Sequence, residues 1–104
     1  MSVLLDLSIF PMDQGEGVSG FVAPVIAMIR DSGQPYRLSP MGTIIETETL
    51  AEALAILECA HTILAQRGCQ RIYATAKFDI RSGPLGRLEG KIVAVQERIG
   101  PVAT

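Results

Sequence analysis

Residues 42–79 read GTIIETETLAEALAILECAHTILAQRGCQRIYATAKFD, and their hydrophobic pattern changes its period twice. At the end of this stretch, residues 71–79 alternate apolar and polar side chains, as a half-buried strand does. In the middle, Thr49 and Glu52 have the spacing of a helical capping box, and an apolar stripe at helical spacing follows. The stripe consists of Leu50, Leu54, Leu57, His61 and Leu64, with Gly68 placed to end the helix. The stretch therefore predicts a strand, a helix and a strand.

The same two periods extend toward the N-terminus. Residues 3–10 alternate and predict a first strand, and Ser19 is the expected N-cap of a helix that follows it. Residues 35–41 and 42–48 predict two short strands with a tight connection between them. Because proline cannot donate a ladder hydrogen bond, Pro40 predicts that the first of these two strands lies at a sheet edge.

Beyond residue 79, a loop rich in glycine and proline precedes a last predicted helix that carries Leu88, Ile92 and Val95. The order is β-α-β-β-α-β plus a C-terminal helix. With right-handed crossovers, this is the split βαβ, or ferredoxin-like, arrangement of the α+β class. It predicts a four-stranded antiparallel sheet with both main helices on one face. The length of 104 residues fits a single domain over residues 1–104.

Composition excludes several classes of partner. The net charge of −2 and the scattered basic residues argue against a nucleic acid. No apolar stretch reaches the roughly 18 residues of a membrane span, and the first residues do not resemble a signal peptide. Cys59 and Cys69 have neither disulfide-scaffold nor zinc-site spacing, and a reducing cytoplasm is the expected compartment.

The sheet face opposite the helices is where the pattern predicts function. Period-two alternation places apolar, hydroxyl and charged side chains on this open face. They are Leu4, Asp6, Ser8, Phe10, Arg37, Ser39, Ile44, Glu46, Glu48, Tyr73, Thr75, Lys77 and Asp79. A half-apolar face of this kind favours pairing with a second copy, and a ligand pocket then becomes possible where subunits meet. Glu46 with Lys77, and Ser8 with Thr75, would offer charge and hydroxyl groups there. The alternative is that these are ordinary cross-strand pairs.

Residues 36–46 (YRLSPMGTIIE) and 75–79 (TAKFD) carry a resemblance to a known family. Together with Ala60-His61, Gly68 and Arg81, they resemble the small thiamine-binding proteins of bacteria, archaea and yeast. The resemblance implies a ferredoxin-like fold, homodimers that pair into tetramers, and no catalytic activity. It also implies binding of thiamine or its hydroxymethylpyrimidine part at a subunit interface.

The resemblance implies that Thr43, Glu46, Thr75 and Lys77 contact this ligand, although Thr47 departs from the family pattern, which has glycine there. A carboxylate and hydroxyls can read the donor and acceptor edge of an aminopyrimidine. Glu46 would accept from its amino group. Thr43 and Thr75 would address the remaining edge, with Ser8 as a further hydroxyl. An aromatic side chain, Phe10 or Tyr36, would cover the ring.

Two other functions stay open at this point. The chain could be a structural or regulatory self-assembling module with no small-molecule ligand. It could also be a small enzyme that acts on a thiamine precursor through Glu46 or His61. A carboxylate pair of Glu46 and Glu48 could do acid–base work, whereas His61 has no visible nucleophile near it in the sequence. The leading interpretation is a non-enzymatic homo-oligomeric binder with no catalytic residue, metal or cofactor, whose ligand is thiamine or its pyrimidine.

Overall fold

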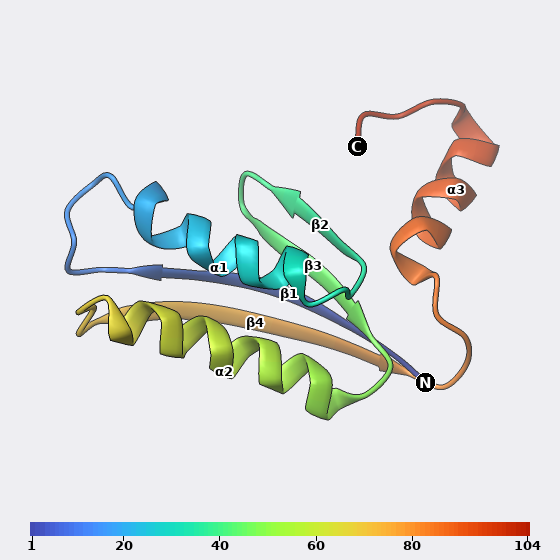
Figure 1. Ribbon diagram of the computed structural model, residues 1–104. Helices are drawn as coiled ribbons and strands as arrows, with labels where there is room; N and C mark the ends of the chain where they lie inside the picture. Colours follow the sequence, from blue (N-terminus) through green and yellow to red (C-terminus); the bar gives the residue numbers. More distant parts are fainter.

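The computed structural model describes residues 1–104, and its helices and strands follow the predicted order (Figure 1). The elements are β1 (Ser2–Pro11), α1 (Ser19–Asp31), β2 (Tyr36–Ser39), β3 (Gly42–Thr47), α2 (Leu50–Gln66), β4 (Ile72–Arg81) and α3 (Arg87–Ile99). The strands form one antiparallel sheet in the order β2-β3-β1-β4, and α1 and α2 lie together on one side of it. The ferredoxin-like α+β prediction is confirmed, and so is the edge position of the strand before Pro40.

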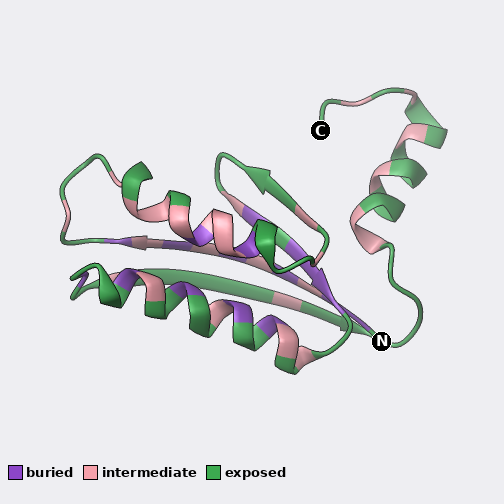
Figure 2. Ribbon diagram, viewed as in Figure 1, coloured by how far each residue is buried: buried purple, intermediate pink, exposed green.

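The core lies between the sheet and the two helices. On β1, the side chains of Val3, Leu5, Leu7 and Ile9 are buried, whereas the residues between them are half-buried (Figure 2). This alternation follows from the two-residue period of a strand, which sends every second side chain to the helix face. Apolar residues of α1 and α2 complete the core: Val25, Ile29, Ala53, Ile56, Ala60 and Leu64.

The register of β1 and β3 decides which face each β3 side chain occupies. Leu7 lies opposite Thr43, and Leu5 lies opposite Ile45, so these β3 residues share the helix face with the core of β1. Leu4 lies opposite Glu46, which places Glu46 on the other face. Thr43 and Glu46 belong to the same segment, residues 42–46, but they lie on opposite faces of the sheet.

The two main helices begin differently. At α2 the capping box is confirmed: the Thr49 hydroxyl accepts from the Glu52 backbone N–H at 3.1 Å, and the Glu52 carboxylate accepts from the Thr49 N–H at 3.1 Å. At α1 the predicted Ser19 cap is wrong. The helix begins one residue earlier, because the carbonyl of Val18 accepts from the N–H groups of Phe21 and Val22, and no side chain caps it.

The predicted core stripe of α2 is confirmed in part, because Leu64 is buried and Leu50 and Leu57 pack against the core. The buried residues are Ala53, Ile56, Ala60 and Leu64, whereas Leu54 is 46% exposed and His61 is exposed. The face of α2 toward the sheet is thus centred on Ala53, Ile56, Ala60 and Leu64, and Leu50 and Leu57 lie at its border. His61, which the predicted stripe included, is therefore a surface residue.

The third helix is set apart from this layer. Helix α3 has no buried residue, and it stands at the end of the sheet where β1 begins, away from α1 and α2 (Figures 1 and 2). Its apolar residues Val93, Val95 and Ile99 are exposed. Most of the open sheet face is consequently uncovered within one chain.

Candidate functional site

A cavity of about 310 Å³ lies between α1, the second half of β1 and the turn that joins β2 to β3. Its lining is mostly apolar: Val22, Val25 and Ile29 come from α1, Leu7 and Ile9 from β1, and Met41 from the turn. The cavity exists because β1 continues past Leu7, where its pairing with β3 ends. A small apolar cleft of this size is typical of a small-molecule site.

Gly42 brings the turn close to β1 at the edge of this cavity. A Cβ atom on Gly42 would lie 3.1 Å from the Leu7 carbonyl oxygen and 3.2 Å from a carboxylate oxygen of Asp6. Any larger residue would push the turn away from β1, since that spacing is tighter than ordinary van der Waals contact. Gly42 therefore fixes the position of Thr43, which follows it.

Thr43 is the buried polar residue of the cavity. It is 3% exposed, and its hydroxyl has no hydrogen-bond partner in the chain. No side-chain polar atom of the structure is fully enclosed without a partner, so the Thr43 oxygen is not fully enclosed, and Thr43 lines the cavity. A hydroxyl with no partner in its own chain keeps its donor and its acceptor free for a ligand in the cavity.

Ser8 and Phe10 form the rim of the cavity on the open-face side of β1. Phe10 lies against Tyr73 of β4, with ring centroids 5.8 Å apart in a tilted arrangement. Ser8 lies opposite Thr75, which is exposed on the same face. Of the predicted ligand residues, the structure thus brings Thr43, Ser8 and Phe10 together and leaves Thr75 next to the rim.

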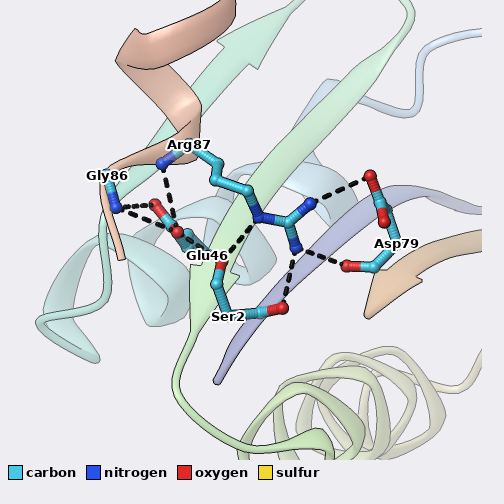
Figure 3. A network of polar contacts seen from close by, with 5 residues as sticks. All are labelled: Ser2, Glu46, Asp79, Gly86 and Arg87. Carbon is cyan, nitrogen blue, oxygen red and sulfur yellow. Dashed lines mark hydrogen bonds and ion pairs between the residues drawn. The ribbon is translucent and has the colours of Figure 1, made fainter. Parts of the chain in front are cut away.

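Glu46 lies elsewhere, in a closed polar network under the start of α3 (Figure 3). It is 1% exposed, and its carboxylate accepts from the Ser2 hydroxyl at 2.5 Å. It also accepts from the backbone N–H groups of Gly86 at 3.1 Å and Arg87 at 3.2 Å. These N–H groups are the first unpaired donors of α3, so Glu46 acts as a helix cap supplied by a distant strand.

Burial alone would raise the pKa of the Glu46 carboxyl. The hydrogen bonds from the Ser2 hydroxyl and from the backbone N–H groups of Arg87, Gly86 and Leu88 outweigh this, and the pKa lies below its usual value. Glu46 is therefore ionised at neutral pH, with its oxygens occupied by groups of its own chain.

Arg87 holds the other side of this network. Its guanidinium donates to the Ser2 hydroxyl at 2.9 Å and to the Ser2 carbonyl at 2.7 Å. It also donates to the Asp79 carbonyl at 2.7 Å and pairs with the Asp79 carboxylate at 2.9 Å (Figure 3). The Ser2 hydroxyl thus connects Glu46 to Arg87, and the network joins β3, β1, β4 and α3.

The remaining predicted residues take other positions. Lys77 is exposed on the open face and pairs with Asp6 at 3.8 Å, so the suggested pairing of Lys77 with Glu46 is wrong. Tyr36 lies opposite Ile45 and packs against the core. Neither residue lines the cavity.

The sequence reasoning missed Ser2 and Arg87. Ser2 precedes the predicted first strand, and Arg87 stands in a predicted loop, so neither carried a pattern. A signal was available in Gly86-Arg87, because a glycine just before an amphipathic run marks a helix start that needs an acceptor from elsewhere.

Comparison with known proteins identifies the family. The family model described as "Thiamine-binding protein" matches residues 5–96. The chain belongs to the thiamine-binding protein family. A UPF0045 protein of Mycobacterium bovis is 38% identical over 96 residues, covering 92% of this chain and 93% of the relative. A UPF0045 protein of Methanothermobacter thermautotrophicus is 30% identical over 98 residues, covering 93% and 99%. The family is named for binding and not for a reaction.

Solved structures share the fold of the family member described here. The protein MJ1052 of Methanocaldococcus jannaschii superposes with a TM-score of 0.79 at 27% identity, covering 92% of this chain and 97% of that one. A Thermotoga maritima protein named for thiamine biosynthesis or salvage has a TM-score of 0.77 at 19% identity, covering 91% and 99%. At that identity, the second likeness bears on the fold alone.

None of the three helices combines the length and the apolar character that a bilayer span needs.

Proposed function

We propose that this chain is a non-enzymatic, homo-oligomeric binder of thiamine or its hydroxymethylpyrimidine part, and that the cavity beside Thr43 is its binding site. The observation that carries the proposal is the buried, unpartnered Thr43 hydroxyl in a mostly apolar cavity of about 310 Å³. Apolar walls suit the faces of a heterocycle, and hydroxyls suit its polar edge. Membership of a thiamine-binding family supplies the ligand class.

The chemistry of the cavity supports binding without catalysis. None of the residues that line it is titratable. The buried carboxylate of the molecule, Glu46, lies on the opposite face of the sheet with its oxygens bonded to Ser2 and to backbone N–H groups. General acid or base catalysis needs a titratable group within hydrogen-bond reach of the ligand.

The rim of the cavity supports a site completed by a second copy of the chain. Met41 is 87% exposed and Leu38 is 62% exposed, and both line the cavity. On the open face nearby, Tyr73 is 56% exposed beside Phe10. Large exposed apolar side chains that gather in this way are typical of an interaction surface, and a homodimer that pairs again would cover them.

Calorimetric titration of the purified protein with thiamine and with hydroxymethylpyrimidine tests the proposal. We expect saturable binding of at least one, and about a tenfold loss of affinity in Thr43→Val. Thr62→Val is the control, because its hydroxyl bonds only to the Glu58 carbonyl on the exposed side of α2. Equal affinity in both variants would contradict the site. An absence of saturable binding would favour a self-assembling module, and turnover of the ligand would favour an enzyme.

Sedimentation velocity over a range of concentrations tests the oligomer separately. We expect a dimer or tetramer, and we expect Met41→Asp to shift it toward the monomer, because a charge on the rim would be buried on assembly. A monomer at every concentration would contradict the interface part of the proposal and leave the cavity part standing.

A further inference from the structure

Strand β1 extends beyond its neighbour on one side. Its ten residues, Ser2–Pro11, all pair with β4, but only Val3–Leu7 pair with β3. Residues 8–11 therefore have an open edge on the β3 side. The cavity lies against this edge, since Ser8, Ile9 and Phe10 line it together with Gly42 and Thr43.

The hydrogen-bond pattern identifies the main-chain groups that face this edge. In β3, the N–H of Glu46 donates to the Pro35 carbonyl, away from β1, so Thr43 and Ile45 turn their N–H and C=O toward β1. Beyond the end of β1, the N–H of Met12 donates to the Arg71 carbonyl and continues the series that faces β4. By this alternation, the main-chain N–H and C=O of Leu7 bond to Thr43. The N–H and C=O of Ile9 point in the same direction, toward the cavity.

These groups of Ile9 are a donor and an acceptor with no strand to pair with. If the register continued, Met41 would lie opposite Ile9. Met41 precedes β3 and belongs to the turn, so it does not pair with Ile9. Ile9 is 8% exposed and belongs to the border of the core. An unmade hydrogen bond of its main-chain N–H or C=O there costs free energy.

We infer that the main-chain N–H and C=O of Ile9 read the polar edge of an aminopyrimidine that enters the cavity, in the way a further strand would. This inference rests on the proposed function. The exocyclic amino group donates to the Ile9 carbonyl, and the adjacent ring nitrogen accepts from the Ile9 N–H. The two ligand groups lie side by side, as do the two groups of one strand residue in an antiparallel ladder. The Thr43 hydroxyl is one ladder step away and bonds to a second substituent.

This arrangement explains why the cavity needs no charged residue. Main-chain groups fixed in a sheet are pre-organised donors and acceptors, and their selectivity comes from geometry. The site would discriminate by the donor–acceptor order of the ring edge. A ring without the amino group would leave the Ile9 carbonyl buried and unpaired, and a site built for hydrogen bonds rejects such an analogue strongly.

Amide hydrogen exchange followed by NMR tests the inference directly. In the free protein, we expect the Ile9 amide to exchange at least about tenfold faster than the amides of Leu7 and Ser8, which are bonded to β3 and β4. Saturating hydroxymethylpyrimidine should slow the Ile9 amide by more than about tenfold and leave Ser8 unchanged. The matched ligand control is the same pyrimidine with hydrogen in place of the amino group, which should bind at least about tenfold more weakly.

The outcomes separate this inference from the proposed function. If calorimetry on the same sample detects no binding of hydroxymethylpyrimidine, the inference fails together with the proposed site. If the ligand binds and the Ile9 amide exchanges as before, the inference fails and the proposed function stands. If the Ile9 amide is already protected without ligand, and more so at higher protein concentration, a strand of a second copy occupies the edge, and that result overturns the inference.

Discussion

The two ends of β3 bury polar side chains in opposite ways. Thr43 and Glu46 are three positions apart and almost equally buried, at 3% and 1% exposed. The Thr43 hydroxyl faces a cavity on the helix side without a partner, whereas the Glu46 carboxylate faces the open side with donors from Ser2, Gly86 and Arg87.

This difference separates binding from structure within one motif. A buried polar group that its own chain satisfies contributes to stability, and its loss leaves other groups unpaired. A buried polar group that its own chain does not satisfy contributes little to the free protein and gains from a ligand. Glu46 therefore attaches α3 to the sheet, and Thr43 is the residue that the proposed function gives to ligand recognition.

The largest expected effect is on Glu46→Ala. Removal of this carboxylate leaves the Ser2 hydroxyl and the backbone N–H groups of Gly86 and Arg87 without their acceptor. We expect a loss of about 3 kcal/mol in the free energy of unfolding, with ligand affinity within about threefold of wild type. Urea denaturation at a fixed protein concentration measures the first quantity, and calorimetry measures the second.

Glu48→Ala is the matched control for this change. Glu48 is exposed, two positions further along the chain, and we expect it to alter stability by less than about 0.5 kcal/mol. If Glu46→Ala instead keeps its stability and loses its affinity for the ligand, Glu46 belongs to the binding site. The contrast between a structural Glu46 and a ligand-binding Thr43 would then be wrong.

A pair of threonine variants on the helix face gives the next largest effect. The Thr47 hydroxyl donates to the Thr49 carbonyl at 2.8 Å, so Thr47→Val should lose about 1 kcal/mol of stability and keep its affinity. Thr43→Val removes a hydroxyl without a partner, so it should keep its stability and lose about tenfold in affinity. Both residues are buried on one strand face, which makes each the control for the other. The same outcome in both would remove the distinction between satisfied and unsatisfied groups.

Acid pH should weaken the Glu46 end selectively. Because the folded pKa of Glu46 lies below the ordinary glutamate value of 4.5, its ionised form stabilises the fold fully above that value. This contribution is lost as the pH falls from there through the folded pKa. We therefore expect the stability difference between wild type and Glu46→Gln to be constant near neutral pH and to shrink on acidification.

Denaturation midpoints of both proteins between about pH 7 and pH 3 give this difference. The pKa of Asp13 is also lowered, chiefly by the backbone N–H of Gln70, but Asp13 is present in both proteins and its effect cancels. If the difference grows on acidification, the fold disfavours the ionised form of the Glu46 carboxyl.

The fold could be predicted from the sequence because the helices and strands follow from patterns among neighbouring residues. The alternation in β1, the Thr49 capping box and Pro40 beside an edge strand are properties of neighbouring residues, and all three appear in the structure. The face of α2 was predicted only in part, because the leucine stripe and the line Ala53, Ile56, Ala60 and Leu64 both have helical spacing and share Leu64.

The site was predicted only in part, for a related reason. Thr43, Ser8 and Phe10 come together because strand register brings them there. The family resemblance grouped Glu46 with Thr43, but three positions along a strand reverse the face, and the alternation alone had placed Glu46 on the open side. The donors that occupy Glu46 lie some 40 positions away in the chain, at Ser2, Gly86 and Arg87. The glycine before α3 indicates that an acceptor is needed, but no local pattern identifies Glu46 as that acceptor.

The smallest expected effect concerns a second tie between the hairpin and α3. Arg37 of β2 forms an ion pair with Glu89 of α3, and their side chains are 53% and 60% exposed. Water and salt screen such a pair, so Arg37→Ala should cost about 0.5 kcal/mol or less and leave the affinity unchanged. Thermal denaturation in low and high salt measures it, and the small difference should vanish in high salt. A loss as large as that of Glu46→Ala would mean that any contact with α3 is sufficient to hold it, and that burial gives the Glu46 network no special weight.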